Sequence, residues 1–397
     1  MAYSRTVIIA GAGIGGLTAA LALAARRIRV IVFEQAHTLQ EVGAGIQLSP
    51  NAARVLIGLG LQPQLQSYVV APDELRIMNA RTERVLARAA LGSFVEKRYG
   101  APYWLIHRGD LQAALIEAVH SNPDITVHLG CRIDDFAAHE NGVTVAIVSG
   151  HRSQEERGLV LVAADGLWSR VRERLGHRNK AQFARHTAWR ALVPAAAVAP
   201  DLRERSVNLW LGRHAHLVHY PVRGGELINV VAIIRDDWRE HGWSAVGDAS
   251  EVLDRFPAGT WPGRLRVALA SAKEWRKWAL YDRAPIVNWG KGPATLLGDA
   301  AHPMLPYLAQ GAAMAIEDAA VLAFRLGENV DAPVAAIRLY ERDRQRRTAR
   351  VQKSARRNGA IYHMGGAEAF VRGLALLAMG GDRVIKRYDW LYAWTPP

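Results

Sequence analysis

The sequence predicts an α/β protein in which a parallel sheet is assembled from distant parts of the chain and a mixed β-sheet domain is inserted into it. The first observation is the order of the N-terminal segments. An apolar run at 6–10 is followed by glycines, an Ala/Leu-rich stretch and a second apolar run at 30–33. This order is typical of a strand, a tight turn, a helix and a parallel strand. Apolar runs at 159–164 and 294–297 each lead into a turn that carries an acid, as buried strands of such a sheet do.

Two further observations concern the middle and the end of the chain. Segments at 207–211, 216–222 and 227–234 alternate in polarity or follow one another across short turns, which is typical of antiparallel strands. After about residue 311 the pattern becomes helical almost to the end. We therefore expect one domain interrupted by a second, β-rich one, followed by C-terminal helices.

Composition narrows the class of protein. The chain has 397 residues, half of them hydrophobic, so it can bury a large core and form more than one structural unit. A single cysteine, Cys131, allows no intrachain disulfide and no thiolate metal cluster, which favours a cytoplasmic location. No apolar stretch is long enough to predict a membrane span.

The formal net charge of +13 favours anionic ligands. The densest basic run, at 338–357, predicts one helix because it contains neither Gly nor Pro. Because no aromatic stacking platform accompanies this run, we interpret it as a solvated helix face and expect no nucleic-acid partner.

The string GAGIGG at 11–16 follows the first predicted strand and begins a helix, with Glu34 at the end of the second strand. Gly11 permits a tight turn, Gly13 lets a pyrophosphate approach the backbone, and Gly16 lets the helix pack closely on the strand. The helix N-terminus would hold the diphosphate, and Glu34 would accept hydrogen bonds from a ribose. The motif predicts a dinucleotide site, although an accidental Gly-rich turn is the simpler alternative.

A second strand-end acid separates FAD from NAD. Asp299 lies in LGDAAHP, and a helix predicted over 312–326 begins just after Gly311. FAD has a ribityl chain whose hydroxyls such an acid can bind, and a helix N-terminus there can stabilise the negative charge of a reduced flavin. The alternative is an ordinary strand, turn and capped helix.

With these motifs in place, the chain resembles the FAD-dependent aromatic hydroxylases, especially the salicylate hydroxylase and 3-hydroxybenzoate 6-hydroxylase group. The resemblance covers nearly the whole chain and includes, in order, the strings EVGAGIQLSPNA at 41–52, HRGDL at 107–111, ADGLWSRVR at 164–172, AWR at 188–190, HYPVRGG at 219–225 and GDAAHPMLPYLAQGAAMAIEDA at 298–319. It implies a Rossmann-like FAD-binding domain over 1–72, 100–178 and 283–325, a substrate-binding β domain over 73–99 and 179–282, and a C-terminal helical segment over 326–397.

The resemblance also implies the chemistry. NAD(P)H reduces the flavin without a nucleotide-binding domain of its own, and O2 then forms a flavin C4a-hydroperoxide that hydroxylates a small aromatic acid. Arg108 matches an arginine that contacts the FAD diphosphate and ribityl region, and Asp165 belongs to the family's DG motif. The predicted cofactor-binding residues are Gly11, Gly13, Gly15, Gly16, Glu34, Gly45, Arg108, Asp165, Asp299, Pro303, Gly311 and Ala312.

The predicted catalytic residues are His216 and Tyr220. Alternation along 216–222 places both on one face of a strand, with Val218 between them. Relatives use a His and a Tyr at this spacing, and His216 would activate the ring hydroxyl. The simpler alternative is a hydrogen-bonded core histidine and a packing tyrosine.

The predicted substrate-binding residues are Gln47 and Pro306 together with His216 and Tyr220. Some relatives that act on pyridine rings have His in place of Gln47, and 3-hydroxybenzoate hydroxylases tend to have Gln in place of Pro306. Three substrate classes therefore stay open: a hydroxybenzoate, an N-heterocycle or a larger fused ring. A flavin-binding redox partner or sensor without turnover is the alternative from another class. We expect a monomer or a homodimer.

No metal site is expected. Alternation puts His219 on the opposite strand face from His214 and His216, so the three imidazoles would not converge. No GxSxG string is present, and Cys131 has no partner motif, so hydrolase chemistry has no support.

Overall fold

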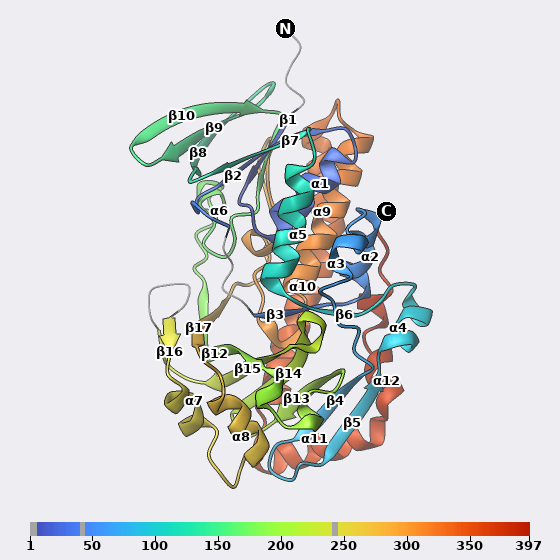
Figure 1. The fold of residues 1–397 in the computed structure, drawn as a ribbon. Coiled ribbons are helices and arrows are strands. Elements are labelled where there is room, and N and C mark those ends of the chain that lie inside the picture. Colours follow the sequence, from blue (N-terminus) through green and yellow to red (C-terminus); the bar gives the residue numbers. More distant parts are fainter. Residues whose placement is uncertain (1–5, 40–43, 240–244) are drawn as a thin grey trace.

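The computed structural model describes residues 6–39, 44–239 and 245–397. The first residues of the motif at 41–52 lie outside this set. Figure 1 shows an α/β part, which contains the N-terminal strands, and a β-rich part, with the long helix α10 running from one to the other. The predicted fold class is confirmed.

The α/β part is built on a five-stranded, fully parallel sheet in the order β18-β11-β1-β2-β7. Its strands come from distant parts of the chain, as predicted: β1 (Thr6–Ala10), β2 (Arg29–Glu34), β7 (Ile125–Leu129), β11 (Val160–Ala163) and β18 (Ala294–Leu296). On one side of the sheet lie α1 (Ile14–Ala24), α5 (Arg108–His120) and α9 (Gly311–Glu328) (Figure 1). On the other lies an antiparallel three-stranded sheet of β8 (Arg132–His139), β9 (Gly142–Ser149) and β10 (Arg152–Gly158).

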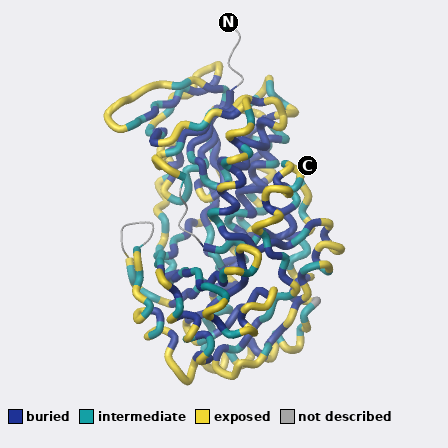
Figure 2. Tube along the Cα trace, viewed as in Figure 1, coloured by how far each residue is buried: buried dark blue, intermediate teal, exposed yellow. Residues whose placement is uncertain are grey.

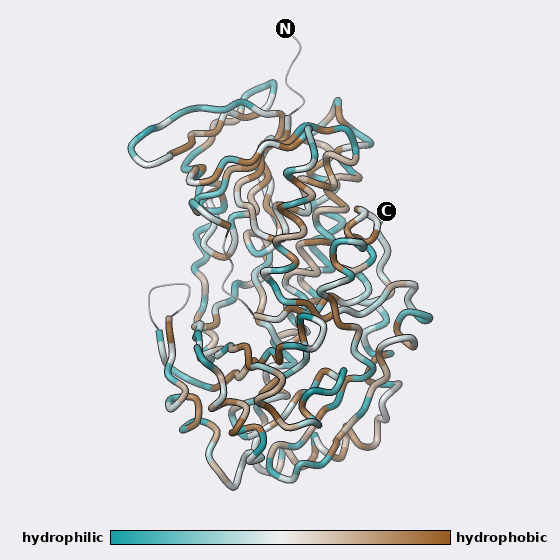
Figure 3. The backbone as a smooth tube through the Cα atoms, in the orientation of Figure 1, coloured by the Kyte–Doolittle hydropathy of each residue, from teal (hydrophilic) through white to brown (hydrophobic). Residues whose placement is uncertain are grey.

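Burial follows the polarity of these strands. Every residue of β1 and β11 is buried, because parallel strands are covered on both faces. In β10, by contrast, the sequence RSQEERG is mostly exposed. Figures 2 and 3 show the same contrast: the central strands are buried and apolar, and the outer hairpin is exposed and hydrophilic. The core of this part is therefore formed by the parallel strands and the helices that pack on them.

The β-rich part is an eight-stranded mixed sheet in the order β16-β17-β12-β15-β14-β13-β4-β5, and among its described strands only β4 and β13 pair in parallel. Its strands are β4 (Glu74–Asn79), β5 (Val85–Ala90), β12 (Gln182–Pro194), β13 (Ser206–Leu211), β14 (Ala215–Val222), β15 (Leu227–Arg235), β16 (Ala245–Gly247) and β17 (Trp275–Asp282). All of them fall inside the two ranges predicted for the β domain. The domain boundaries themselves stay an interpretation.

Shorter elements complete the chain. A two-stranded antiparallel ribbon, β3 (Gly45–Leu48) and β6 (Trp104–His107), lies between the two parts. The remaining helices are α2 (Pro50–Gly58), α3 (Gln62–Leu65), α4 (Gly92–Tyr99), α6 (Arg170–Arg174), α7 (Ala249–Arg255), α8 (Gly263–Ala270), α11 (Gly366–Met379), α12 (Gly381–Lys386) and α13 (Asp389–Tyr392), with 3-10 turns η1 (Ala195–Ala197), η2 (Pro200–Leu202), η3 (Arg223–Gly225), η4 (Gly298–Ala300) and η5 (Pro306–Leu308). None of the described helices is long and apolar enough to cross a membrane.

The basic run at 338–357 is helical, as predicted, and belongs to α10 (Pro333–Tyr362). Its interpretation as a solvated face is wrong in part. Arg344 is 1% exposed and forms ion pairs with Glu317 and Asp318 of α9, and Arg347 pairs with Glu317 as well. One face of this basic helix therefore holds α9 in place.

Candidate active site

The glycine turn between β1 and α1 is shaped by close contacts on two of its residues. Gly11 has φ +100°, and a Cβ there would lie 2.6 Å from the carbonyl oxygen of Ala164. A Cβ on Gly16 would collide with the carbonyl oxygen of Gly11. At Gly13, however, a Cβ would meet no atom within 4 Å, so this edge is open to a ligand. The three positions match the roles expected in a dinucleotide turn.

Glu34 lies where the fingerprint requires an acid. Its carboxylate accepts hydrogen bonds from the backbone N–H groups of Ala12 and Ala36, each at 2.8 Å. The acid at the end of β2 is thereby placed next to the N-terminus of α1. No side chain caps that terminus, and its first turn carries no acid, so the helix dipole is available to an anion.

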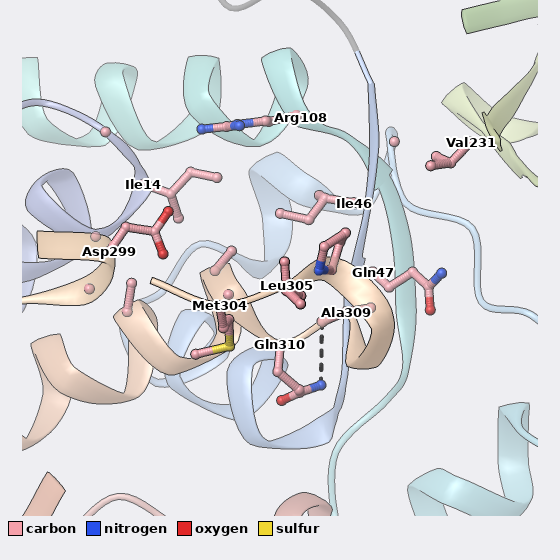
Figure 4. A pocket seen from close by; sticks show the side chains of 18 of the residues that line it. Ile14, Ile46, Gln47, Arg108, Val231, Asp299, Met304, Leu305, Ala309 and Gln310 are labelled. Atoms are coloured by element: carbon pink, nitrogen blue, oxygen red, sulfur yellow. Dashed lines mark hydrogen bonds between the residues drawn. The ribbon is translucent and has the colours of Figure 1, made fainter. Parts of the chain in front are cut away.

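A cavity of about 360 Å³ starts at this turn and extends to the β-rich sheet, within the usual size range of ligand sites. Figure 4 shows Arg108 and Asp299 directed into one end of it, near Ile14, and Gln47 and Val231 at the other. The predicted site residues that line the cavity are Gly13, Gly15, Gly45, Gln47, Arg108, His216, Tyr220, Asp299, Pro306, Gly311 and Ala312.

The other predicted residues lie outside the lining. Gly11, Gly16 and Glu34 shape or flank the turn. Asp165 accepts hydrogen bonds from the backbone N–H groups of Arg170 and Val171, at 2.9 and 3.4 Å, so it supports the start of α6, which Ser169 caps. Pro303 is buried, and its carbonyl accepts from Gln352 Nε2 at 2.8 Å. Direct cofactor contacts of Asp165 and Pro303 stay predictions.

Asp299, in η4 just after β18, has a carboxylate that is exposed to the cavity yet lies deep in the molecule. Burial raises its pKa, against the opposing effects of His302 and Arg108. An acid held this way is a ready acceptor for a ligand hydroxyl.

The N-terminus of α9 faces the same space through Gly311 and Ala312, again without a side-chain cap. One elongated cavity is therefore surrounded by the glycine turn, a guanidinium, an acid that faces the cavity and a second helix N-terminus. These groups fit the diphosphate, ribityl chain and flavin of FAD.

The opposite end of the cavity is formed by the β-rich sheet. His216, Val218 and Tyr220 of β14 line it together, as strand alternation predicts, next to Val231 and Ile233 of the neighbouring strand β15. The surface is a small apolar floor between a histidine and a tyrosine. Their catalytic roles stay predictions.

His216 is 2% exposed, and its Nδ1 lies 2.9 Å from Nε2 of His363. Since Nδ1 is engaged in this contact, Nε2 is the nitrogen left to face the cavity. Burial lowers the pKa of His216 well below its usual value, and the neighbouring His363 and His186 lower it further. The ring is therefore neutral at ordinary pH, as a base must be.

Tyr220 is equally buried, and burial raises its pKa. It packs against Gly45, where a Cβ would lie 2.6 Å from the tyrosine ring. Gln47 lies beside it and accepts a hydrogen bond from the hydroxyl of Tyr103 at 2.7 Å. Tyr220 stays a neutral hydroxyl that can donate to a substrate.

Three residues at the site were not assigned from the sequence. Asn229 accepts a hydrogen bond from Gly45 N at 2.6 Å. As a lone polar residue inside an apolar stretch, it could have been recognised in the sequence as a candidate site residue. Arg190 lines the cavity from β12, 5.0 Å over the ring of Trp278. His363 follows a 30-residue helix and gave no local signal.

The remaining histidine of the strand points elsewhere. His219 is 2% exposed and stacks on Trp210, with ring centroids 6.4 Å apart. Within the described chain, no three His, Cys, Asp or Glu residues are grouped so that they could hold a metal.

A dinucleotide cradle that joins a buried His/Tyr face in one cavity defines a flavin-dependent oxidoreductase. The chain belongs to the family described as FAD binding domain, whose model matches residues 4–355. It is 39% identical over 389 residues to 3-hydroxybenzoate 6-hydroxylase 1 of Aquipseudomonas alcaligenes, covering 98% of this chain and 97% of that protein. A 3-hydroxybenzoate 6-hydroxylase of Polaromonas naphthalenivorans strain CJ2 is 37% identical, with 98% and 96% covered.

Among solved structures, a salicylate hydroxylase in complex with its substrate superimposes with a TM-score of 0.82 at 26% identity, over 100% of this chain and 97% of that one. These findings confirm the predicted family. The protein is a flavoprotein monooxygenase that uses FAD, NAD(P)H and O2.

Proposed function

We propose that this monooxygenase hydroxylates a small phenolic aromatic acid of the hydroxybenzoate type. The observation that carries the proposal is that His216 and Tyr220 line the same cavity as Arg108, Asp299 and the glycine turn. A ring held against β14 thus lies next to the bound cofactor. The names of the relatives in the comparison support the same substrate class.

Bound FAD supplies the oxygen-transfer chemistry, and the protein prepares the ring. Nε2 of His216 takes the proton of the ring hydroxyl, which makes the ring carbons more nucleophilic. The hydroxyl of Tyr220 hydrogen-bonds the same oxygen, while Val218 and Ile233 provide an apolar floor that excludes water.

The acid group of the substrate needs a cation, and Arg190 is placed to provide one. It lines the cavity beside Tyr220, whose pKa it acts to lower. A planar guanidinium suits a carboxylate because it can donate two parallel hydrogen bonds. We therefore assign substrate binding to Arg190 together with Gln47, Pro306, His216 and Tyr220.

We further propose a cytoplasmic enzyme that is a monomer or a homodimer. The single cysteine supports a reducing compartment. Light scattering on the FAD-loaded protein would determine the oligomeric state, and a mass above that of a dimer would contradict this proposal.

The test is to follow NADH oxidation by the FAD-loaded protein with 3-hydroxybenzoate, salicylate and 6-hydroxynicotinate, and to identify each product. We expect a hydroxylated benzoate. His216→Ala should keep its FAD but hydroxylate about 100-fold more slowly, the usual scale for loss of a general base.

His151→Gln, in the exposed turn between β9 and β10, is the matched control and should behave as the unaltered protein. Hydroxylation of 6-hydroxynicotinate alone would replace the proposed substrate class by an N-heterocycle. Normal turnover by His216→Ala would refute the assigned base.

A further inference from the structure

An ion pair joins the two parts of the molecule that form the cavity. Arg223 lies in η3, the turn between β14 and β15, and Asp110 lies in the first turn of α5. Arg223 Nε donates to Asp110 Oδ2 at 2.9 Å, and Arg223 Nη2 donates to Asp110 Oδ1 at 2.7 Å. The guanidinium thus binds the carboxylate through two hydrogen bonds, which fix orientation as well as distance.

The two residues of this pair lie close in sequence to opposite ends of the cavity. Arg223 follows shortly after Tyr220, which lines the end formed by the β-rich sheet. Asp110 follows shortly after Arg108, which lines the cofactor end. The ion pair therefore connects the strand face that we assign to the substrate with the helix start that we assign to the cofactor.

Burial makes this pairing difficult to give up. Asp110 is buried, whereas the side chain of Arg223 is 44% exposed. Burial acts to raise the pKa of Asp110, but the hydrogen bonds and charge of Arg223, together with His107, outweigh it and lower that pKa. Asp110 is therefore an ionised carboxylate. Without Arg223 this buried charge would lose the donor that satisfies both of its oxygens, which is costly.

The backbone of Arg223 is held in a conformation that disfavours arginine. Its φ is +51°, in the left-handed region, and Gly224 and Gly225 follow with φ of +64° and +99°. Such a conformation persists in a non-glycine residue only where surrounding contacts maintain it. The two hydrogen bonds to Asp110 are contacts of this kind, so the shape of the turn and the ion pair support each other.

A second contact joins the same elements. Asn229 of β15, which pairs with Tyr220 of β14, accepts a hydrogen bond from Gly45 N at 2.6 Å. Gly45 begins β3 and pairs with His107, the residue before α5. The hairpin of β14 and β15 is thus attached at two points, and attachment at two points restricts its rotation about either one.

Resting on the proposed function, we propose that Asp110 and Arg223 are positioning residues that set the distance between the substrate ring and the flavin. They act through α5 and β14, which carry the residues that line the cavity. A displacement of about 1 Å can lower the rate of a reaction by about 100-fold. When the ring is displaced, NADH, O2 and a proton are converted to NAD+ and H2O2, and the ring is not hydroxylated.

The test compares the hydroxylated product formed with the NADH consumed, for the FAD-loaded protein with 3-hydroxybenzoate. Arg223→Gln removes the charge of the arginine, and Asp110→Asn removes that of the acid. Arg223→Lys keeps the charge but not the two parallel hydrogen bonds. The ratio of product to NADH does not depend on how much enzyme is folded, so it separates positioning from stability.

Arg185 supplies a matched control. Like Arg223, it has a left-handed backbone, with φ +56°, and it binds Asp237 through Nε and Nη2 at 3.0 and 3.3 Å. Both side chains of that pair are exposed, and both residues belong to the β-rich part. Arg185→Gln should therefore keep the product ratio of the unaltered protein.

We expect Arg223→Gln and Asp110→Asn each to lower the product per NADH at least about twofold, with H2O2 accounting for the difference. Arg223→Lys should lie between Arg223→Gln and the unaltered protein, and it tests the same link if the other variants fail to retain FAD. The double variant should be no worse than the poorer single one, because both changes break one link. Hydrogen–deuterium exchange should become faster in two segments, β14 with η3 and the start of α5.

Unchanged product ratios in the Arg223 and Asp110 variants would overturn the proposal, and so would a double variant in which the two losses multiply. If the unaltered protein does not hydroxylate 3-hydroxybenzoate, the proposed function fails instead. The exchange measurement, which needs no substrate, then decides the positioning role. Faster exchange in both segments supports the link between the two parts, and faster exchange in η3 alone contradicts it.

Discussion

At the scale of single residues, the two acids at the cofactor end of the cavity are held differently. The carboxylate of Asp299 faces the cavity, and burial raises its pKa. Glu34, by contrast, is already held by two backbone N–H groups. The acid that has most to gain from a bound ligand is therefore Asp299.

We predict that Asp299→Ala weakens FAD binding by about tenfold or more, since it removes a charged acceptor worth about 1.5–3 kcal/mol. FAD fluorescence titration of the stripped protein would measure this. The FAD affinity of Asp299→Asn, which keeps one acceptor oxygen, should lie between that of the unaltered protein and that of Asp299→Ala. Asp124→Ala, in an exposed turn before β7, is the control. Unchanged affinity in Asp299→Ala would make Asp299 a structural residue.

At the scale of elements, α9 and α10 are joined by a buried network that also positions the cofactor turn. Asp318 accepts from Arg344 Nε at 2.7 Å and from the backbone N–H of Gly298 at 3.0 Å, next to Asp299. Burial acts to raise the pKa of Asp318, but His302 and Arg344 outweigh it, and the carboxylate stays ionised. The ion pair between α9 and α10 therefore also holds the backbone next to Asp299 at the cofactor site.

We predict that Arg344→Ala lowers the free energy of unfolding by about 3–5 kcal/mol, because it leaves Glu317 and Asp318 buried with less neutralising charge. Urea unfolding would measure the change. Arg346→Ala, exposed on the same helix, should change stability by less than about 0.5 kcal/mol. Similar effects of the two variants would contradict the structural role of the buried pairing.

At the scale of the whole molecule, buried neutral histidines make stability depend on pH. His216 and His219 are each 2% exposed, and burial lowers both pKa values, that of His219 to about 3. In the unfolded chain both histidines bind protons below pH about 6.5. The unfolded state then binds more protons than the folded state, so stability falls as the pH falls from about 6.5 toward the folded pKa.

We predict that His219→Gln lowers the slope of the unfolding free energy against pH by about 1.4 kcal/mol per pH unit between pH 6 and 4, which corresponds to about one proton. His219 lies outside the cavity, so the cofactor should not respond. Unfolding free energies measured across this range would show the slope, and His151→Gln should leave it unchanged. An identical slope in His219→Gln would mean that the folded state also takes up this proton.

The sequence by itself determined the parallel sheet, the glycine turn with its acid, and the cavity-facing side of β14. These features are encoded locally: Gly11 needs a positive φ, and alternation places His216 and Tyr220 on one side whatever the strand packs against. The family resemblance supplied the cofactor, because its motifs span almost the whole chain.

The tertiary structure decided what lies opposite those residues. It turned Asp165 toward the start of α6, buried Arg344 in a basic helix interpreted as solvated, and brought His363 to His216 across 147 positions of sequence. No local pattern encodes such pairings, because they depend on how α9, α10 and the β-rich sheet pack together. Residue spacing fixes which way a side chain leaves its own element, but only the packing of elements decides what it meets.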